Sequence, residues 1–488
     1  MIRMSLADAA EVMQGQLALP AQKEAATTAA PNASAPTFDT FAGVSTDSRS
    51  VVPGQLFFAL EGARFDGHEF LQQAAQSGAS ALVVREDHAA AKTFADVTNH
   101  AVPLIYVAQP LTALQQLARH WRCTLPTKVI GVTGSNGKTT VKEMLAAILA
   151  KAGPTFATRG NLNNHIGVPL MLCEIDPQHA FAVIEMGTSG PGEIAMLTQI
   201  ACPDVTLVNN CGAAHLERLG SVAGVAREKS AIHAGLRAEG TAVINLDDAF
   251  AEVCRTAAGK HKTLGFSAQA VTDADAKADA DVFVLACTPT NDGLGSRLTF
   301  SVNGCEATTT LPLPGAHNIA NALAAAACAT AAGLSPAQIA DGLAETVPSG
   351  GRLEVLRGPA GSRVIHDAYN ANPDSLRAGL AALRALPGEH WLVLGDMREL
   401  GPGEVEAHRA AGTLAATAGI ARLFTFGVLA NLACATFSGP TESFSEHEAL
   451  TERLRSVLGP DVVLLVKGSR SNRLERVVVP LTSEEIRR

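Results

Sequence analysis

The sequence predicts an α/β protein of three domains built on mostly parallel sheets. At 488 residues the chain is too long for one hydrophobic core, and about two to four domains are expected from its length. Short apolar runs alternate with helical segments along its second and third parts, which is typical of parallel sheets. A glycine-rich loop joins one such run, Val129–Val132, to an amphipathic helix that Gly153-Pro154 ends.

The composition is that of a globular protein. Hydrophobic residues make up 47% of the chain and charged residues 17%, which excludes a disordered chain. The formal net charge is -9 and no Lys/Arg-rich block occurs, so neither nucleic acid nor an anionic membrane is expected as the main partner. The nine scattered cysteines lack a C-x-x-C pair, which favours reduced thiols. Asp8 and Glu11 stand where a signal peptide would be apolar, and no apolar run is long enough to cross a membrane. A soluble, cytoplasmic protein without membrane insertion is therefore expected.

Residues 1–125 are expected to form an N-terminal α/β domain. Strands are predicted at Gly54–Leu60 and Ala79–Val84. Residues 22–40 are rich in Ala, Thr and Pro, and we interpret them as a surface loop or linker. A polar cluster in this domain could be only a turn, or it could present hydroxyls and a guanidinium to a polar ligand. Its members are Ser45, Thr46, Asp47, Ser48 and Arg49.

The glycine-rich loop opens the second domain, residues 126–348, and predicts a triphosphate site. Its glycines let backbone N–H groups approach phosphates, and the helix N-terminus adds partial positive charge. The lysine can reach the β- and γ-phosphates, and the first threonine can ligate Mg²⁺. The first glycine of the strict pattern would sit at Val132, so an ordinary glycine-rich turn is the alternative interpretation. The loop consists of Gly134, Ser135, Asn136, Gly137, Lys138, Thr139 and Thr140.

Two more strands of the second domain end in polar side chains. Phe181–Ile184 ends in Glu185, which is placed to hold Mg²⁺ because ligands sit at the carboxyl ends of parallel strands. Val205–Val208 is followed by His215, which could be structural or could belong to the same layer as Glu185.

Other parts of the second domain carry weaker signals. Arg227-Glu228-Lys229 favours a solvated charge cluster when it is taken by itself. Short alternating runs between Ala268 and Pro312 suggest an antiparallel insert or edge, and an Ala-rich helix follows Asn318.

Residues 349–488 are expected to form a third, doubly wound domain of Rossmann-like type. Polar residues lie just beyond the ends of two of its strands, at Asp396 and at Lys467–Arg470, where doubly wound sheets bind ligands. No G-x-G-x-x-G opens the domain, so dinucleotide binding is not indicated. The predicted strands are Val364-Ile365, Leu392–Leu394, Leu423–Phe426 and Val462–Val466.

Taken together, these residues resemble the Mur ligase family of ATP-dependent enzymes, which build the peptide stem of peptidoglycan. The resemblance covers almost the whole chain and is weakest over Gln14–Phe41, which looks longer than the family typically needs. The motifs that occur in the family's order and approximate spacing are Gly134–Thr140, Glu185, His215, Lys229, Asn318, Arg352 and Asp367. The more specific segments are Gly160–Pro169, Leu311–Asn321, Asp367–Asn372, Leu394–Met397 and Lys467–Ser471.

The resemblance implies a division of tasks, with the uridine nucleotide in the first domain, ATP in the second and an incoming dipeptide in the third. The specific segments are similar to those of the branch that acts on UDP-N-acetylmuramoyl-tripeptide and D-alanyl-D-alanine. The implied reaction is amide ligation through an acyl phosphate, with ATP and Mg²⁺ as cofactors. A monomer is expected, and the third residue of the tripeptide stays open between meso-diaminopimelate and lysine.

The resemblance also implies roles for single residues. Lys138, Arg352 and Mg²⁺ would together neutralise the negative charges of the tripeptide's terminal carboxylate and of the triphosphate. Thr139 and Glu185 would serve one Mg²⁺, and His215 a second together with Lys229, which the family carbamylates. Asn318 would contact adenine and Asp367 the ribose, and Ser45–Arg49 is the candidate uridine site. Further substrate candidates are Asn163, Asn164, Asn370, Asn372, Asp396, Lys467 and Arg470.

Two alternatives remain open at this point. One is another ligase of the superfamily, such as a folylpolyglutamate synthase or a different Mur ligase. Ligases that add diaminopimelate carry a D-N-P-R type motif, whereas here Asn372-Pro373 is followed by Asp374. The other alternative is a nucleotide-dependent binding protein without ligase chemistry.

Overall fold

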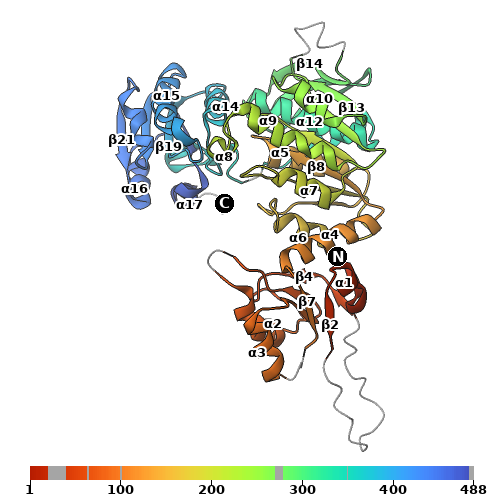
Figure 1. The fold of residues 1–488 in the computed structure, drawn as a ribbon. Coiled ribbons are helices and arrows are strands. Elements are labelled where there is room, and N and C mark those ends of the chain that lie inside the picture. Colours follow the sequence, from red (N-terminus) through yellow and green to blue (C-terminus); the bar gives the residue numbers. More distant parts are fainter. Residues whose placement is uncertain (20–39, 63–64, 99–101, 270–278, 349, 483–488) are drawn as a thin grey trace, which may run out of the picture.

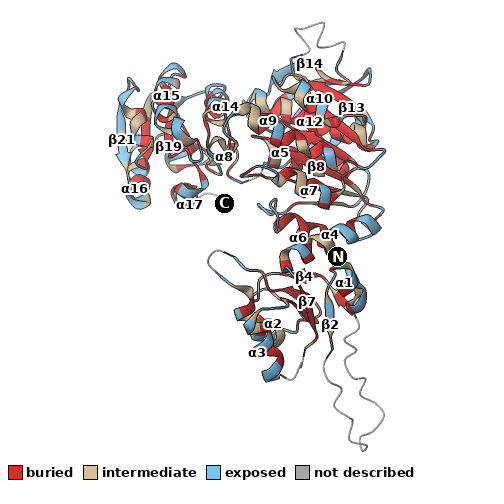
Figure 2. Cartoon of the chain, in the orientation of Figure 1, coloured by how far each residue is buried: buried red, intermediate tan, exposed pale blue. Residues whose placement is uncertain are grey.

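The computed structural model describes residues 1–19, 40–62, 65–98, 102–269, 279–348 and 350–482. Three sheet-based units follow one another along the chain (Figure 1), and the expected α/β class is confirmed. Buried residues follow the strands and the inner faces of the helices (Figure 2). Most of residues 22–40, for which a surface loop or linker was predicted, lie outside the described residues.

The N-terminal unit is a five-stranded sheet in the order β2-β7-β6-β5-β4, with β1 and β3 paired as a separate antiparallel ribbon. The two predicted strands correspond to β5 and β6, and the remaining strands were not predicted. The strands are β1 (Arg3–Ser5), β2 (Gln16–Ala18), β3 (Thr40–Ala42), β4 (Val44–Ser45), β5 (Leu56–Phe58), β6 (Ala81–Arg85) and β7 (Leu104–Val107). The helices are α1 (Leu6–Val12), η1 (Gly67–Phe70), α2 (Leu71–Gln76), α3 (Ala89–Thr98) and α4 (Pro110–Thr124).

Helix α4 connects the first unit to the second through its packing. It contacts α6 and α7 of the central unit as well as α1. The fully buried Arg122 donates to Asp204 at 2.7 Å and to the carbonyl of Ala201 at 3.0 Å. A buried charge is tolerated only when it is paired in this way. The end of α4 is therefore anchored in the central unit.

The central unit is a nine-stranded sheet in the order β16-β15-β14-β13-β12-β11-β8-β10-β9. Strands β8 to β14 are parallel, and β14, β15 and β16 pair antiparallel at one edge, as predicted for that part of the sequence. The strands are β8 (Lys128–Thr133), β9 (Thr155–Ala157), β10 (Phe181–Glu185), β11 (Val205–Val208), β12 (Thr241–Asn245), β13 (Lys262–Ser267), β14 (Val282–Pro289), β15 (Ser296–Val302) and β16 (Cys305–Leu311).

Helices cover both faces of the central sheet, and the Ala-rich α12 packs directly against α5. Small alanine side chains let two helices approach closely in a densely packed core. The helices are α5 (Lys138–Leu149), α6 (Gly167–Glu174), α7 (Glu193–Ala201), α8 (Leu216–Leu219), α9 (Val222–Ser230), η2 (Ala231–Gly235), α10 (Ala251–Ala258), α12 (Ala316–Ala332) and α13 (Pro336–Ala344).

The C-terminal unit is a six-stranded sheet in the order β17-β18-β22-β19-β20-β21, parallel except for β17. The four predicted strands are confirmed, and both edge strands were missed. The strands are β17 (Glu354–Arg357), β18 (Arg363–Asp367), β19 (Glu389–Gly395), β20 (Arg422–Phe426), β21 (Thr441–Phe444) and β22 (Val462–Lys467). The helices are η3 (Pro359–Gly361), α14 (Pro373–Arg384), η4 (Gly401–Gly403), α15 (Glu404–Thr417), η5 (Ala430–Ala435), α16 (His447–Val457), η6 (Arg470–Asn472) and α17 (Glu475–Thr482).

Two predictions from composition can be set beside the structure. Among the described residues, no helix combines the length and apolar character that a membrane span requires. All nine cysteines lie within the described ranges and are free thiols.

Candidate functional site

A cavity of about 710 Å³ is lined by residues at the carboxyl ends of the central strands and by residues of the C-terminal unit. Its lining combines the loop 135–140, the ends of β10 and β11, the start of α12 and residues of the third unit. The lining includes the predicted site residues Ser135, Asn136, Gly137, Lys138, Thr139, Thr140, Asn163, Asn164, Glu185, His215, Asn318, Arg352, Asp367, Asn370, Asn372 and Lys467.

The glycine loop folds tightly between β8 and α5. Gly137 has a φ of 78°, and a Cβ there would lie 2.4 Å from Oδ1 of Asn321, so only glycine fits this position. The Asn136 backbone N–H donates to Oδ1 of Asn210 at 2.8 Å. Lys138 Nζ donates to the carbonyl of Gly134 at 2.7 Å, and burial lowers the pKa of this ammonium. The loop thus holds a cation at the start of a 12-residue helix, the arrangement that favours phosphate.

Glu185 closes the floor of the cavity at the end of β10. Its carboxylate accepts from the Thr139 hydroxyl at 2.9 Å and from the Asn163 side-chain amide at 2.8 Å. Glu185 is only 2% exposed. A hydroxyl and a carboxylate side by side are oxygen donors of the type that Mg²⁺ prefers. These residues therefore fit a magnesium ion beside the phosphate loop.

Lys229 lies in the core, and the interpretation of this segment as a solvated cluster is wrong. Its side chain is fully buried on α9, and its Nζ has no hydrogen-bond partner in the described part of the chain. Burial, followed by the charge of Lys138, lowers the pKa of Lys229 to about 7. Glu228 is also buried and accepts from the backbone N–H groups of Gly192 and Ile194, at 2.7 and 2.8 Å.

The physical reason for this correction is helix orientation. The side of α9 that carries Val225, Ala226 and Lys229 turns inward, and only Arg227 of the charged triplet is exposed. Lys229 is not among the residues that line the cavity, although its charge interacts with that of Lys138. An unpaired buried amine is costly, which marks it as a functional candidate.

His215 lines the cavity and directly precedes α8. Its φ of 54° lies in the left-handed region. Its Nδ1 is 2.6 Å from Oε2 of Glu399, which belongs to the C-terminal unit. Glu399 was not predicted, since nothing in its local sequence indicates a partner so far along the chain.

A row of asparagines joins the start of α12 to the phosphate loop. Asn318 Nδ2 donates to the carbonyl of Pro314 at 2.8 Å, and its Oδ1 accepts from Asn321 at 3.1 Å. The side-chain amide of Asn209 then donates to Oδ1 of Asn321 at 2.9 Å. Asn321 and Asn209 line the cavity, and neither was assigned a role from the sequence. The signal that was available is that Asn321 sits one helical turn beyond Asn318.

The third unit contributes a stacked arginine and an ion pair. The Arg352 guanidinium lies 4.2 Å from the ring centre of Tyr369, a cation–π contact. Lys467 is 1% exposed, and its Nζ donates to Oδ2 of Asp367 at 2.6 Å and to the carbonyl of Asn370 at 3.2 Å. Lys467 thus neutralises Asp367 at the rim of the cavity.

Two asparagines at the cavity rim have defined local roles. Asn372 caps α14 and its side-chain amide donates to Oδ1 of Asn136, at 2.9 Å, across the two units. Oδ1 of Asn164 accepts from the N–H groups of Ile166 and Gly167, at 3.1 and 2.8 Å, and shapes the turn that precedes α6.

Asp396 and Arg470 do not line the cavity. Asp396 is 3% exposed, and its carboxylate accepts from the Ala430 N–H at 2.8 Å and from Arg398 at 3.0 Å. Arg470 has an exposed side chain 5.8 Å from the ring centre of Tyr369. Asp396 therefore braces its own unit, while Arg470 stays near the aromatic ring that Arg352 covers.

The Ser45–Arg49 cluster also lies outside the cavity, in the N-terminal unit. Asp47 and Arg49 form an ion pair at 2.7 Å, and the hydrogen bonds from Arg49 lower the pKa of Asp47 to about 2. The Ser48 hydroxyl donates to Gln73 at 2.9 Å. Thr46 directly follows β4 and precedes Asp47. The guanidinium of Arg49 is largely exposed and remains able to meet a ligand.

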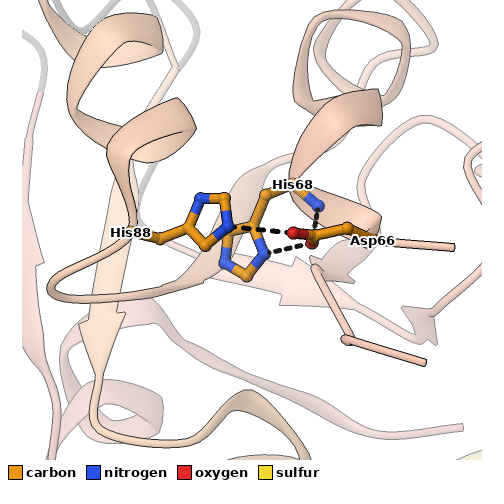
Figure 3. A group of neighbouring side chains, drawn as sticks. All are labelled: Asp66, His68 and His88. Atoms are coloured by element: carbon orange, nitrogen blue, oxygen red, sulfur yellow. Dashed lines mark hydrogen bonds and ion pairs between the residues drawn. The ribbon is translucent and has the colours of Figure 1, made fainter. Parts of the chain in front are cut away.

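A second group of titratable side chains lies in the N-terminal unit (Figure 3). Asp66 bridges His68 Nδ1 at 2.7 Å and His88 Nε2 at 2.9 Å, and the two rings stack with centroids 3.9 Å apart. The other ring nitrogens accept backbone N–H groups, from Arg85 at 3.0 Å and Ala90 at 3.2 Å.

These bonds decide what the three side chains can do. In each ring the nitrogen that faces away from Asp66 accepts a hydrogen bond from a backbone N–H, so it carries no proton. The nitrogen that faces Asp66 must therefore carry the proton of the neutral ring. A metal at Asp66 would need those two nitrogens deprotonated. The group is thus a saturated hydrogen-bond network that ties η1 to the segment after β6, and sequence spacing alone did not reveal it.

Comparisons with known proteins agree with the geometry of the central cavity. Three family models match: "Mur ligase family, catalytic domain" over residues 40–122, "Mur ligase middle domain" over 132–329, and "Mur ligase, glutamate ligase domain" over 351–470. The UDP-N-acetylmuramoyl-tripeptide–D-alanyl-D-alanine ligase of Escherichia coli K12 is 40% identical over 90% of this chain and 93% of its own. Its Bacillus subtilis counterpart is 35% identical over 99% of both chains.

Solved structures give the same result. MurF from Acinetobacter baumannii superposes with a TM-score of 0.85 at 30% identity and covers 99% of both chains. MurF ligase from Thermotoga maritima in complex with ADP has a TM-score of 0.78 at 27% identity, over 91% of this chain and 98% of its own. Folylpolyglutamate synthase from Mycobacterium tuberculosis, at 18% identity and a TM-score of 0.60, shares the fold alone. With relatives this similar along nearly its whole length, and with the phosphate loop, acidic strand end and third-domain residues facing one cavity, the chain belongs to the Mur ligase family.

Proposed function

We propose that this protein is the ATP-dependent ligase that joins D-alanyl-D-alanine to UDP-N-acetylmuramoyl-tripeptide in peptidoglycan precursor synthesis. One observation carries the proposal: the phosphate loop of the central unit and the polar residues of the C-terminal unit line the same cavity. A nucleotide-dependent binding protein would not require this convergence. We assign residues 1–125 to the uridine nucleotide, 126–348 to ATP and 349–488 to the dipeptide.

The reaction proceeds in two steps. An oxygen of the tripeptide's terminal carboxylate attacks the γ-phosphorus of ATP, which gives an acyl phosphate and ADP. The amine of D-alanyl-D-alanine then attacks the acyl carbon, loses a proton and forms the amide, while inorganic phosphate leaves. Both steps bring anions together, so fixed cations in a site screened from water lower the barrier.

Residues of the chain divide this work. Gly134–Thr140 wrap the phosphates, and Lys138 with Arg352 offsets the charge of the carboxylate and the γ-phosphate. Asn318 is held by two hydrogen bonds in an orientation that can meet adenine. Asp367, fixed by Lys467, is placed for the ribose. Asn163, Asn164, Asn370 and Asn372 line the same cavity, and we assign them to the substrates.

Magnesium would be held by Thr139 and Glu185, whose oxygens already lie 2.9 Å apart. A second ion would involve His215 and a modified Lys229. When bound, Mg²⁺ would supply positive charge to the phosphate oxygens. Because burial lowers the pKa of Lys229 to about 7, part of its amine is neutral near pH 7. The nitrogen of a neutral amine can bond to the carbon of CO₂ and release a proton, which gives a carbamate. The carbamate would add a carboxylate group to the unpaired Nζ, and the oxygens of that group would be the metal ligands.

The carbamate can be tested by chemical rescue. Lys229→Ala should be nearly inactive, and small carboxylic acids in solution should restore part of the activity by occupying the vacated position. A variant that retains most of its activity would remove the carbamate from the proposal. Lys260→Ala, which changes an exposed lysine of the same unit, is the matched control.

The function itself is tested by a ligation assay read by mass spectrometry. Purified protein, ATP and Mg²⁺ are supplied with D-alanyl-D-alanine and with either the meso-diaminopimelate or the lysine form of UDP-N-acetylmuramoyl-tripeptide. We expect a product with the mass of one of the two UDP-N-acetylmuramoyl-pentapeptides. We also propose that the protein acts as a monomer in the cytoplasm. If neither tripeptide is extended, the proposed function is wrong.

A further inference from the structure

The strongest feature that the proposed roles leave unexplained is the contact between His215 and Glu399. The two residues are far apart in sequence and belong to different units, yet Nδ1 of His215 and Oε2 of Glu399 lie 2.6 Å apart. Both residues have left-handed backbones, with φ of 54° and 65°. Such conformations cost free energy in residues other than glycine and persist only where the surrounding structure enforces them.

The loop that carries Glu399 is fixed to the C-terminal unit on one side and lies against the central unit on the other. The backbone N–H of Met397 donates to His408 at 2.8 Å, and that of Arg398 donates to Ser469 at 2.9 Å. The carboxylate of Asp396 holds Arg398 at 3.0 Å. On the other side, a Cβ on Gly401 would lie only 3.3 Å from Cα of Glu217. The carboxylate of Glu399 therefore reaches His215 only while the two units are docked at this point.

The contact also fixes the chemical form of His215. A carboxylate can only accept, so Nδ1 of His215 carries the proton and donates it. In the neutral ring the lone pair then resides on Nε2, for which the described residues provide no hydrogen-bond partner. A histidine whose Nδ1–H is held by a carboxylate is the usual arrangement of a metal-binding or hydrogen-bond-accepting imidazole. His215 lines the cavity, so its ring is part of the site.

Cations of the central unit surround the Glu399 carboxylate. Besides its contact with the His215 ring, the carboxylate interacts with the charges of Arg218 and Lys138. Lys138 and Arg218 come from the central unit, so the carboxylate faces positive charge from the surface on which it docks.

We propose that Glu399 is a positioning residue, which sets the tautomer and orientation of His215 when the C-terminal unit docks on the central unit. The inference rests on the proposed function. In that function, His215 has the required tautomer and orientation only when the unit that holds the dipeptide is docked on the central unit. It also gives a role to Asp396, whose carboxylate braces the loop that ends in Glu399.

The direct test is the tautomer of His215. In protein labelled with ¹⁵N-histidine, the His215 resonances can be identified among the 14 histidines by their absence from a His215→Gln spectrum. At a pH where the ring is neutral, wild-type protein should show the Nδ1–H form. Glu399→Ala should shift the ring toward the Nε2–H form or a mixture, and Glu399→Gln, whose amide oxygen can still accept, should retain the wild-type signal. An unchanged tautomer in Glu399→Ala would overturn the inference.

Controls separate the carboxylate from the strained backbone. Glu399→Gly also lacks the carboxylate but relaxes the left-handed conformation, so it should fold at least as well as wild type and still lose the Nδ1–H form. Glu406→Ala removes an exposed carboxylate of α15 in the same unit and should change nothing. If Glu399→Gly kept the wild-type tautomer, the backbone rather than the carboxylate would position His215.

A kinetic measurement links the tautomer to the reaction. Outer-shell partners of metal-binding histidines typically contribute about 10- to 100-fold in affinity or activity. The Mg²⁺ concentration that gives half-maximal activity should therefore rise by about tenfold or more in Glu399→Ala, and less in Glu399→Gln. The spectrum does not depend on ligation, so an inactive wild-type protein would count against the proposed function while leaving the tautomer result intact. A changed tautomer with unchanged Mg²⁺ dependence would overturn the link between His215 and the metal.

Discussion

The side-chain amide of Asn372 donates a 2.9 Å hydrogen bond to Oδ1 of Asn136 and so joins the cap of α14 to the phosphate loop. The same side chain accepts from the Ser375 backbone N–H at 2.8 Å and caps the helix. One residue thus serves both the stability of the C-terminal unit and its contact with the glycine-rich loop of the central unit. The two roles use different atoms, Nδ2 and Oδ1, so substitution can separate them.

Asn372→Ser should retain the helix cap and lose the contact with the loop. We expect a near-normal melting temperature and a ligation rate that falls about 2- to 10-fold, since one neutral hydrogen bond contributes about 0.5–1.5 kcal/mol. Asn372→Ala should also destabilise the C-terminal unit by about 1 kcal/mol, because the cap is lost. Melting curves and steady-state rates measure both effects. Equal stability and equal rates in all three proteins would contradict the assignment.

Lys138→Ala should abolish ligation while leaving the fold intact. Among the described residues, the Lys138 ammonium bonds only to the carbonyl of Gly134, and its loss removes charge that the transition state needs. A drop in rate of about 10²-fold or more is expected from the loss of such a contact. Circular dichroism checks the fold, and Lys260→Ala, an exposed lysine after α10, is the control. A folded Lys138→Ala protein that turns over at near-normal rates would rule out the proposed ATP site.

The buried Lys229 predicts a pH dependence of stability. Its pKa is about 7 in the folded protein and about 10.4 in an unfolded chain, so between these values the unfolded state binds more protons. Stability should therefore rise with pH from about 7 to about 10.4 and show no such contribution below pH 7. In CO₂-free buffer, the melting temperature of wild type relative to Lys229→Met should increase across this window. Parallel curves for the two proteins would show that Lys229 does not titrate as proposed.

The Ser45–Arg49 cluster is best tested by a point substitution. A truncation before residue 127 would remove α4 and expose the buried partners of Arg122, so loss of binding could not be assigned to the cluster. Arg49→Ala should weaken binding of UDP-N-acetylmuramoyl-tripeptide about tenfold, because one charge-assisted hydrogen bond contributes about 1.5 kcal/mol or more. ADP binding should not change. Calorimetry measures both, with the exposed Lys92→Ala as control. Unchanged affinity for the uridine substrate would move that site elsewhere.

The sequence predicted the central strands and the phosphate loop because their signals are local. An apolar run, a glycine loop and an amphipathic helix follow one another without interruption from Val129 to Leu149. Edge strands such as β17 and β21 were missed because they are only four residues long and partly exposed, which weakens the apolar pattern.

Only those site residues that belong to a local sequence pattern could be predicted. Glu185 is the last residue of an apolar strand, which is a local pattern. Glu399 is part of the site only through its contact with His215 of another unit, which no local pattern indicates. Lys229 was read as solvated because neighbouring charges suggest an exposed face, and the burial of this helix face is set by tertiary packing. Lys467 looked available for a ligand, but a parallel pairing between β18 and β22 places it against Asp367.

The central claim, ligation through an acyl phosphate, is tested most directly by isotope transfer. UDP-N-acetylmuramoyl-tripeptide labelled with ¹⁸O in the terminal carboxylate is incubated with ATP, Mg²⁺, D-alanyl-D-alanine and the protein, and the released phosphate is analysed by mass spectrometry. We predict that phosphate is released efficiently only when tripeptide and dipeptide are both present, and that each phosphate carries one oxygen from the carboxylate. Phosphate without label, or release that is independent of the two peptides, would contradict the account.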